Sequence, residues 1–248
     1  PSEDPFVRQE LVETLYHLLW ELVHVFFEHR GLLSGRTHDT GASAFLYPFL
    51  GEAAPDVDAV VADVAASVRM KSAEVVELRE QTLGEGQEQL AAAAGVLRER
   101  FDAGGRLLVL GNGGSATDAM DVAADFRHPP GGWRPRRVLD LTEDAAILTA
   151  LANDIGTEAI FARQVIAHGR AGDALLAIST SGGSGNVLAA LAEARRRAMA
   201  TIALVGYDGG EIAAGGLADH VVITRSQHIP RIQEAQASAY HVLRELVG

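Results

Sequence analysis

From residue 72 onward the sequence alternates short apolar runs, rich in β-branched side chains, with longer segments of helical periodicity. Such alternation is typical of a parallel sheet with helices on both faces, because each parallel connection needs a crossover and each covered face makes the strands apolar. Strands are expected at Arg106–Gly111, Val138–Leu141, Ala174–Ser179, Thr201–Gly206 and His220–Thr224. Helices are expected between and after them, at Ser115–Arg127, Glu158–Ala167, Asn186–Arg197 and Ile229–Leu246. The predicted fold class is therefore α/β, a five-stranded parallel sheet sandwiched by helices in a flavodoxin-like or Rossmann-like way, with the strand order left open.

Residues 1–72 are expected to form a helical extension, and residues 73–248 the domain that contains the sheet. An apolar seam at spacings of four and three indicates a packed helix, through Leu11, Leu15, Leu18, Leu22 and Val25. Glycines and prolines over Ser34–Pro55 predict a loop, and a second helix is expected to start near Asp56. A long helix is expected over Ala73–Phe101, ended by the glycines that follow it.

Charge and cysteine content exclude several classes of protein. The chain of 248 residues carries 33 acidic and 21 basic side chains, a formal charge of -12, so a nucleic-acid backbone would be repelled. Without cysteine there is no disulfide, no thiol nucleophile and no cysteine-ligated metal, which fits the reducing cytoplasm where we expect the protein. The best apolar stretch, residues 11–27, is interrupted by Glu13 and Glu21 and lacks a basic leader, so we expect neither a membrane span nor a signal peptide.

Two loops rich in glycine and serine follow predicted strands and open predicted helices, at Gly111–Ser115 and Ser179–Asn186. Free amides at a helix N-terminus attract an anion, and glycine lets a ligand approach the backbone. Serine hydroxyls add neutral donors that suit a phosphate in an acidic protein. Because the carboxyl ends of parallel strands share one edge of a sheet, the two loops indicate a single phosphate-binding crevice.

Other phosphate motifs fit less well. No Gly-Lys-Ser/Thr follows either loop, which excludes a Walker phosphate loop. Gly111, Gly113 and Ala116 match part of the dinucleotide fingerprint, and Asp140 ends the second predicted strand where a ribose-binding acid is placed. The hypothesis of a nicotinamide-dependent dehydrogenase rests on that partial match alone, and the hydroxyl-rich second loop argues against it.

Residues 73–248 resemble the sugar isomerase (SIS) domain family and, within it, the phosphoheptose isomerases, also called sedoheptulose 7-phosphate isomerases. The matching runs are Gly111-Asn112-Gly113-Gly114-Ser115, Asn153-Asp154-Ile155-Gly156, Ile178-Ser179-Thr180-Ser181-Gly182 and Arg231-Ile232-Gln233-Glu234, with His241 eight residues after Gln233. The resemblance implies an aldose–ketose isomerase without a nucleotide cofactor. It also implies a homotetramer whose active sites lie at subunit interfaces.

The resemblance further implies roles for individual residues. The phosphate group would be held by Ser115, Ser179, Ser181 and Ser184. The sugar would be surrounded by Asn112, Gly113, Asp154, Thr180 and Gln233. Asp125 and His241 would be the catalytic acid/base groups that move a proton through an enediol. Some family members bind zinc at the positions of Asp121, Asp125, Gln233 and His241, so a divalent metal such as Zn²⁺ is a candidate cofactor.

Two of these positions depart from the family pattern, which has histidine at position 121 and glutamate at position 125. Asp118, Asp121 and Asp125 lie within about 60° of one another on their helix, and without the resemblance they would be interpreted as a solvated acidic face. On the last helix His241 lies opposite the apolar arc, so it is expected to point outward and to be covered by a neighbouring subunit.

Two functions follow. The first is a cytosolic isomerase that converts sedoheptulose 7-phosphate, or a close relative, into heptose 7-phosphate. The alternative is a non-catalytic SIS module that senses phosphosugars or binds a protein, and the altered residues Asp121 and Asp125 motivate it.

Overall fold

The computed structural model describes residues 2–29 and 57–248, and the loop expected over Ser34–Pro55 lies outside them. Two compact units can be distinguished, Pro1–Val75 and Val76–Gly248. Helix α3 (Val57–Asp102) runs through this boundary and through the boundary expected after residue 72. Two separate helices were expected there, but no glycine or proline occurs between Val57 and Leu83 to end the first one.

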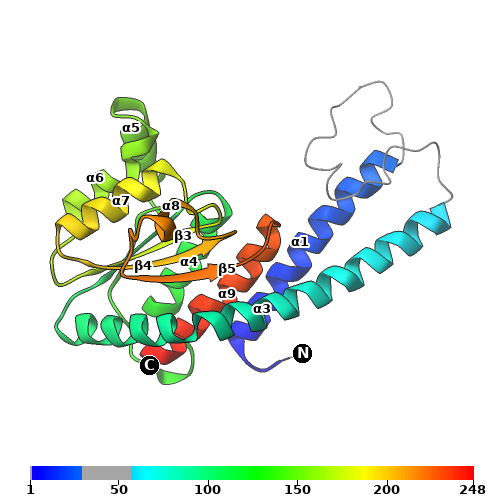
Figure 1. The fold of residues 1–248 in the computed structure, drawn as a ribbon, viewed down its shortest axis with the longest axis horizontal. Coiled ribbons are helices and arrows are strands. Elements are labelled where there is room, and N and C mark those ends of the chain that lie inside the picture. The colour runs from blue at the N-terminus through cyan, green and yellow to red at the C-terminus, as the bar shows by residue number, and fades with distance from the viewer. Residues whose placement is uncertain (1, 30–56) are drawn as a thin grey trace. The chain divides into compact units, whose positions relative to one another are not determined.

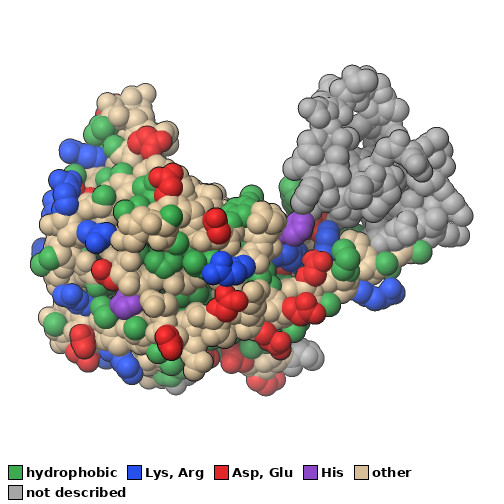
Figure 2. All heavy atoms as spheres, viewed as in Figure 1, with side chains coloured by type: hydrophobic (Ala, Val, Ile, Leu, Met, Phe, Trp, Pro, Cys, Tyr) green, Lys and Arg blue, Asp and Glu red, His purple; other side chains and the backbone are tan. Residues whose placement is uncertain are grey.

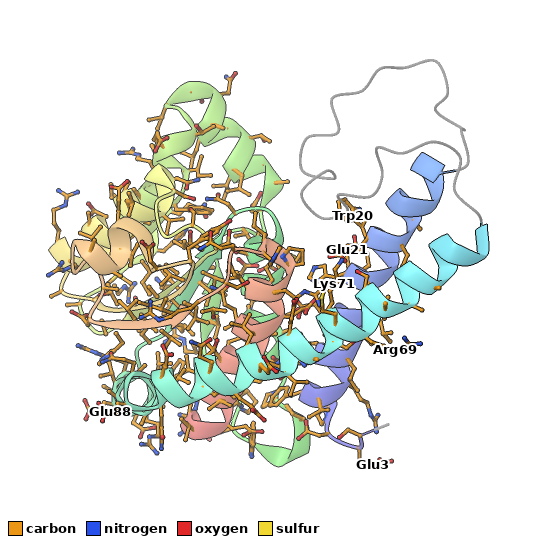
Figure 3. The ribbon with its side chains drawn as sticks, turned by 45° about the vertical axis from the view of Figure 1, so that its right-hand side comes forward. Glu3, Trp20, Glu21, Arg69, Lys71 and Glu88 are labelled. Atoms are coloured by element: carbon orange, nitrogen blue, oxygen red, sulfur yellow. The ribbon has the colours of Figure 1, made fainter. Side chains whose placement is uncertain are left out.

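In the N-terminal unit, helix α1 (Pro5–His29) buries a narrower face than the expected seam. Leu18 is buried, whereas Leu11 and Leu15 are 45% and 58% exposed. Glu21 is also buried, and its carboxylate forms an ion pair with the ammonium of Lys71 on α3; Figure 3 shows the two side chains directed toward one another. Leu11 and Leu15 of the predicted apolar seam are therefore left on the surface of α1, Leu22 is partly buried, and the side chain of Val25 lies outside the description.

The second unit contains the expected five-stranded parallel sheet, which confirms the predicted fold class (Figure 1). Its strands are β1 (Leu107–Gly111), β2 (Val138–Asp140), β3 (Ala174–Ser179), β4 (Ala200–Gly206) and β5 (His220–Thr224). The order across the sheet is β2-β1-β3-β4-β5, which is the flavodoxin-like order. Its strand order reverses between β1 and β3, and ligands of open parallel sheets bind beyond the strand ends at such a point.

Helices cover both faces of the sheet. They are α4 (Gly114–Arg127), α5 (Ala145–Asp154), α6 (Ile160–His168), α7 (Gly185–Arg196), α8 (Gly210–Ala214) and α9 (Ile229–Val247), with 3₁₀ turns η2 (Pro130–Gly132) and η3 (Thr157–Ala159). One apolar layer joins the sheet to α4, α9 and the C-terminal part of α3, and a second layer joins it to α6, α7 and α8. Helix α5 was not expected; the Asp144 carboxylate caps it by accepting hydrogen bonds from the amides of Ala146 and Ile147.

Charged side chains of both signs are distributed over the face of the second unit seen in Figure 2. Among the helices formed by residues 2–29 and 57–248, none combines the length and the apolar character needed to cross a bilayer.

Candidate functional site

The loop after β1 is shaped by glycines that admit no side chain. A Cβ on Gly111 would lie 2.1 Å from the carbonyl oxygen of Ser115, and Gly113 has a positive φ of 56° as it enters α4. The turn is tight enough to place Ser115 in the first turn of α4, where it is buried. Gly113 has no side chain to cap the helix, so the first amides of α4 receive no side-chain cap.

The loop after β3 is built from hydroxyl groups that hold its own backbone. Ser179 Oγ accepts a hydrogen bond from the amide of Gly182 (3.1 Å), and Ser181 Oγ accepts one from the amide of Gly183 (3.3 Å). Ser181 Oγ also lies 3.5 Å from Ser184 Oγ, and Thr180 next to it is partly exposed. Ser184 precedes α7 without capping it, so the amide end of α7 stands beside a cluster of hydroxyls.

The two loops meet. Strands β1 and β3 are neighbours, with Gly111 paired to Ile178, so their carboxyl ends lie side by side. Asn112 and Asn186 exchange two side-chain amide hydrogen bonds, 2.8 and 3.0 Å long. The two loops are therefore adjacent, as the sequence predicts, and their role in binding a phosphate stays a prediction.

Two residues without a predicted role also lie here. Asn186 is one, through its pairing with Asn112. The other is Glu158 of η3, whose carboxylate lies so close to Gly185 that a Cβ there would be 1.8 Å from Oε2. Neither follows from strand and helix periodicity, because both contacts join segments that are distant in sequence. Asp154, by contrast, is exposed at the end of α5 and accepts a hydrogen bond from its neighbour Asn153.

Helix α9 reaches the first loop through Gln233. A Cβ on Gly114 would lie 2.0 Å from Gln233 Nε2, so the amide occupies the space that any other residue at 114 would fill. Gln233 is buried, at 9% exposure.

Farther along the same two helices, Asp125 of α4 faces His241 of α9. The Asp125 Oδ2 and His241 Nε2 atoms are 3.7 Å apart. Burial is the main cause that raises the pKa of the Asp125 carboxyl to about 6; the negative charge of Asp121 adds to it, and His241 and Arg244 oppose it. A carboxyl group with such a pKa exchanges protons readily near neutral pH.

The position of His241 corrects the sequence analysis. The residue was expected to point outward from the single chain, but only 3% of it is exposed, and its ring packs edge-on against Tyr240 at 4.6 Å between centroids. Helix α4 packs on α9 and provides the partner that an isolated helical wheel does not show. The acidic face of α4 is likewise not solvated as a whole, because Asp118 is buried and Asp121 and Asp125 are partly buried.

The four predicted metal ligands do not form a closed site in this arrangement. Gln233 precedes His241 by eight residues, about 12 Å along the helix axis, and it lies against Gly114 rather than Asp125. Within residues 2–29 and 57–248, no three histidine, aspartate or glutamate side chains converge as a metal would require. Asp125 and His241 approach each other to 3.7 Å, but a pair of donors is fewer than the three or four protein ligands of zinc sites.

Comparison with known proteins gives a consistent result. A family model described as the SIS domain matches residues 72–206. A phosphoheptose isomerase of Chlorobium phaeobacteroides is 43% identical over 172 residues, which are 67% of this chain and 75% of the relative. One from a Roseiflexus species is 41% identical over 179 residues, 69% of this chain and 87% of the relative.

Solved structures are similar as well. The phosphoheptose isomerase of Neisseria gonorrhoeae superposes with a TM-score of 0.69 at 34% identity, over 74% of this chain and 98% of that one. The enzyme from Francisella tularensis gives a TM-score of 0.70 at 31% identity, over 74% and 97% of the two chains. Both cover nearly the whole of the solved chains, so the part of this chain outside the match is an addition to a complete SIS fold.

Proposed function

Because the chain belongs to the SIS-domain family and, within it, to the phosphoheptose isomerases, which are aldose–ketose isomerases, we propose that it converts sedoheptulose 7-phosphate into a heptose 7-phosphate. The observation that carries the proposal is the pair formed by Asp125 and His241, whose carboxylate and imidazole face each other at 3.7 Å. A carboxylate and an imidazole in contact are the groups needed for an enediol reaction, in which one proton moves between carbons and another between oxygens.

The phosphate would bind where the two loops meet. Ser115, Ser179, Ser181 and Ser184 supply hydroxyls there, and the amide ends of α4 and α7 supply the favourable helix dipole. Asn112, Gly113 and Thr180 border the same place, and Gln233 connects it to α9. Asp154 is proposed from the family resemblance alone.

In the proposed reaction, the Asp125 carboxylate removes a proton from C1 of the ketose and forms the enediol. His241 donates a proton to O2 as the C2 carbonyl becomes a hydroxyl, and then takes the proton from O1. The proton held by Asp125 returns to C2, which leaves an aldehyde at C1 and both side chains in their starting states. Burial of His241 and partial burial of Asp125 limit the water that could exchange with the transferred proton.

A divalent metal would supply Lewis acidity at the carbonyl oxygen. Since Asp121, Asp125, Gln233 and His241 do not converge here, no step above is assigned to one. Treatment with a chelator tests whether turnover needs a metal.

We also propose that the chain assembles with copies of itself, as a homotetramer with active sites at subunit interfaces, in the cytoplasm. Support for assembly comes from α1, where Val12, Leu15, Tyr16 and Leu19 are each between 58% and 65% exposed. Apolar side chains gathered on one helix are typical of a protein–protein contact.

The test is to incubate the purified protein with sedoheptulose 7-phosphate and to follow the aldose product by NMR. Turnover that is lost in both Asp125→Asn and His241→Ala supports the proposal. Phosphosugar binding without turnover, with and without added divalent metal, would instead favour the sensing or interaction module, for which the shortened Asp125 is the motivating observation.

A further inference from the structure

The end of helix α4, which contains Asp125, is closed in an unusual way. The last four carbonyls of a helix have no amide donor one turn ahead within the helix. The carbonyl of Ala124 receives the amide of His128 (2.7 Å) and that of Phe126 receives the amide of Arg136 (2.7 Å). The donor in line for the carbonyl of Asp125 would be residue 129, which is a proline and has no N–H.

Arg244 of α9 supplies the missing donor. Its Nε donates a hydrogen bond of 3.0 Å to the backbone oxygen of Asp125. A cation is also favoured at this place, because the carbonyl end of a helix carries the negative end of its dipole. Arg244 therefore replaces the intrahelical bond that Pro129 removes.

The guanidinium itself contacts two aromatic rings. Its central carbon lies 4.8 Å from the centre of the Phe126 ring and 4.7 Å from that of Trp133, and only 1% of Arg244 is exposed. Pro129 turns the chain out of the helix, and Trp133 directly follows the η2 turn, which begins at Pro130. Contact with two aromatic rings leaves the guanidinium little freedom, so the hydrogen-bonded Nε is fixed in direction.

We propose that Arg244 is a positioning residue for the reaction: packed against Phe126 and Trp133, it holds the Asp125 carbonyl and fixes the last turn of α4 so that the Asp125 carboxylate faces His241. This inference rests on the proposed function, since it concerns the same carboxylate. It adds a residue outside the two phosphate loops, whose effect reaches the reacting carbons only through Asp125.

A role in catalysis can be separated from a role in stability alone. Loss of the arginine leaves the phosphate loops unchanged, so substrate binding should change little while the chemical step slows. A displacement of about 1 Å at a catalytic group lowers the rate by up to about 100-fold. We therefore expect Arg244→Ala to lower kcat by about 10- to 100-fold with KM nearly unchanged.

Three further measurements complete the test. Arg244→Lys keeps a cation and a donor and should restore part of kcat, as should guanidinium ion added to Arg244→Ala. Arg197→Ala is the matched control, because Arg197 donates to the carbonyl of Gly169 just after α6, at the opposite edge of the sheet from the two loops. It should lower stability without a change in kcat.

Hydrogen exchange and fluorescence do not depend on turnover. The chain has two tryptophans, so Trp20→Phe leaves Trp133 as the sole emitter. In that background Arg244→Ala should shift the emission of Trp133 and speed amide exchange over residues 124–133, whereas Arg197→Ala should do neither.

An unchanged kcat in a folded Arg244→Ala protein would overturn the assignment, and so would an equal loss of kcat in Arg197→Ala. If the wild-type protein shows no turnover, the proposed function fails by itself. Amide hydrogen exchange and Trp133 fluorescence then test whether Arg244 fixes the end of α4. No change in either measurement in Arg244→Ala would overturn this, and a change confined to residues 124–133 would support it.

Discussion

Asn112 and Asn186 bind each other through both of their side-chain amides, although they stand 74 residues apart on different loops. The pairing joins the turn after β1 to the first turn of α7, and so holds together the two halves of the proposed phosphate site. A site assembled in this way depends on a contact that neither loop can make alone.

Asn186→Ala should therefore weaken substrate binding more than it weakens the fold. Loss of one such hydrogen-bonded pair costs about 1 kcal/mol, so we expect KM to rise about 5-fold and kcat to change little. Steady-state kinetics with sedoheptulose 7-phosphate measure this, with Thr149→Ala on the exposed face of α5 as the control. A KM unchanged from wild type would show that the loops keep their geometry without the pair.

Gly114→Ala should abolish most activity. The new Cβ would lie 2.0 Å from Gln233 Nε2, so the amide must leave its place at the first turn of α4. Gly84→Ala is the matched control, because a Cβ there meets nothing within 4 Å and replaces a glycine inside α3. The control should gain about 0.5–1 kcal/mol of stability and keep full activity. Equal activities in the two variants would contradict the role given to Gln233.

The raised pKa of Asp125, about 6, predicts the acid limb of the pH profile. The carboxyl must be ionised to accept a proton, so kcat/KM should fall about tenfold per pH unit below pH 6. If Asp125 is the titrating group, the midpoint of this acid limb should shift in the Asp125→Glu variant. An acid limb centred near pH 4 in the wild type would show that burial does not govern this group.

The same pKa predicts a gain in stability when the carboxyl is removed. The folded protein holds the proton of Asp125 more tightly than the unfolded chain, whose pKa is near 3.8, so the free energy of unfolding decreases as the pH rises from about 4 to 6. At pH 7, Asp125→Asn should remove a penalty on the order of 2–3 kcal/mol and raise Tm, while activity is lost. Thermal denaturation at pH 4 and pH 7 checks this, since the gain should vanish at pH 4.

Treatment with EDTA should leave turnover unchanged, because no three carboxylate or imidazole side chains among the described residues converge as metal donors. Activity that disappears on chelation and returns with Zn²⁺ would show that Asp121 and Gln233 move toward Asp125 and His241 in the working enzyme.

A charge placed on α1 should disrupt self-association. Leu15→Glu and Leu19→Glu replace side chains that are 58% and 60% exposed in the single chain. Light scattering coupled to size exclusion should show smaller particles for both variants than for Gln9→Glu, which adds the same charge elsewhere on α1. An unchanged mass would place the interface on another surface.

The sheet was predictable because its three central strands, β1, β3 and β4, are buried on both faces and are apolar over most of their length. Its order was not, because strand neighbours depend on packing between distant segments. Helix α5 was missed since its sequence has no polar face that repeats with helical period, and its N-cap, Asp144, was overlooked.

The site could be predicted only in part for the same reason. Glycine and serine after two strands indicated the loops, but the link through Asn186 and the approach of Glu158 to Gly185 are tertiary contacts. The roles of Asp125 and His241 were predicted from the family resemblance. A projection of the last helix alone predicted an exposed His241, because it cannot include α4, which packs against it; the residue is buried.

Helices α4 and α9 run in the same direction, since Gly114 meets Gln233 at one end and Asp125 meets His241 farther along. The distance between these two contacts limits the length of the substrate. When the phosphate ester is bound beside Gly114 and Gln233, only a carbon chain of matching length places its reacting carbons next to Asp125 and His241. Ketose phosphates with shorter carbon chains should bind and inhibit without reacting. Substrate selectivity would then depend on the distance between the two contacts of α4 and α9 rather than on contacts to each hydroxyl.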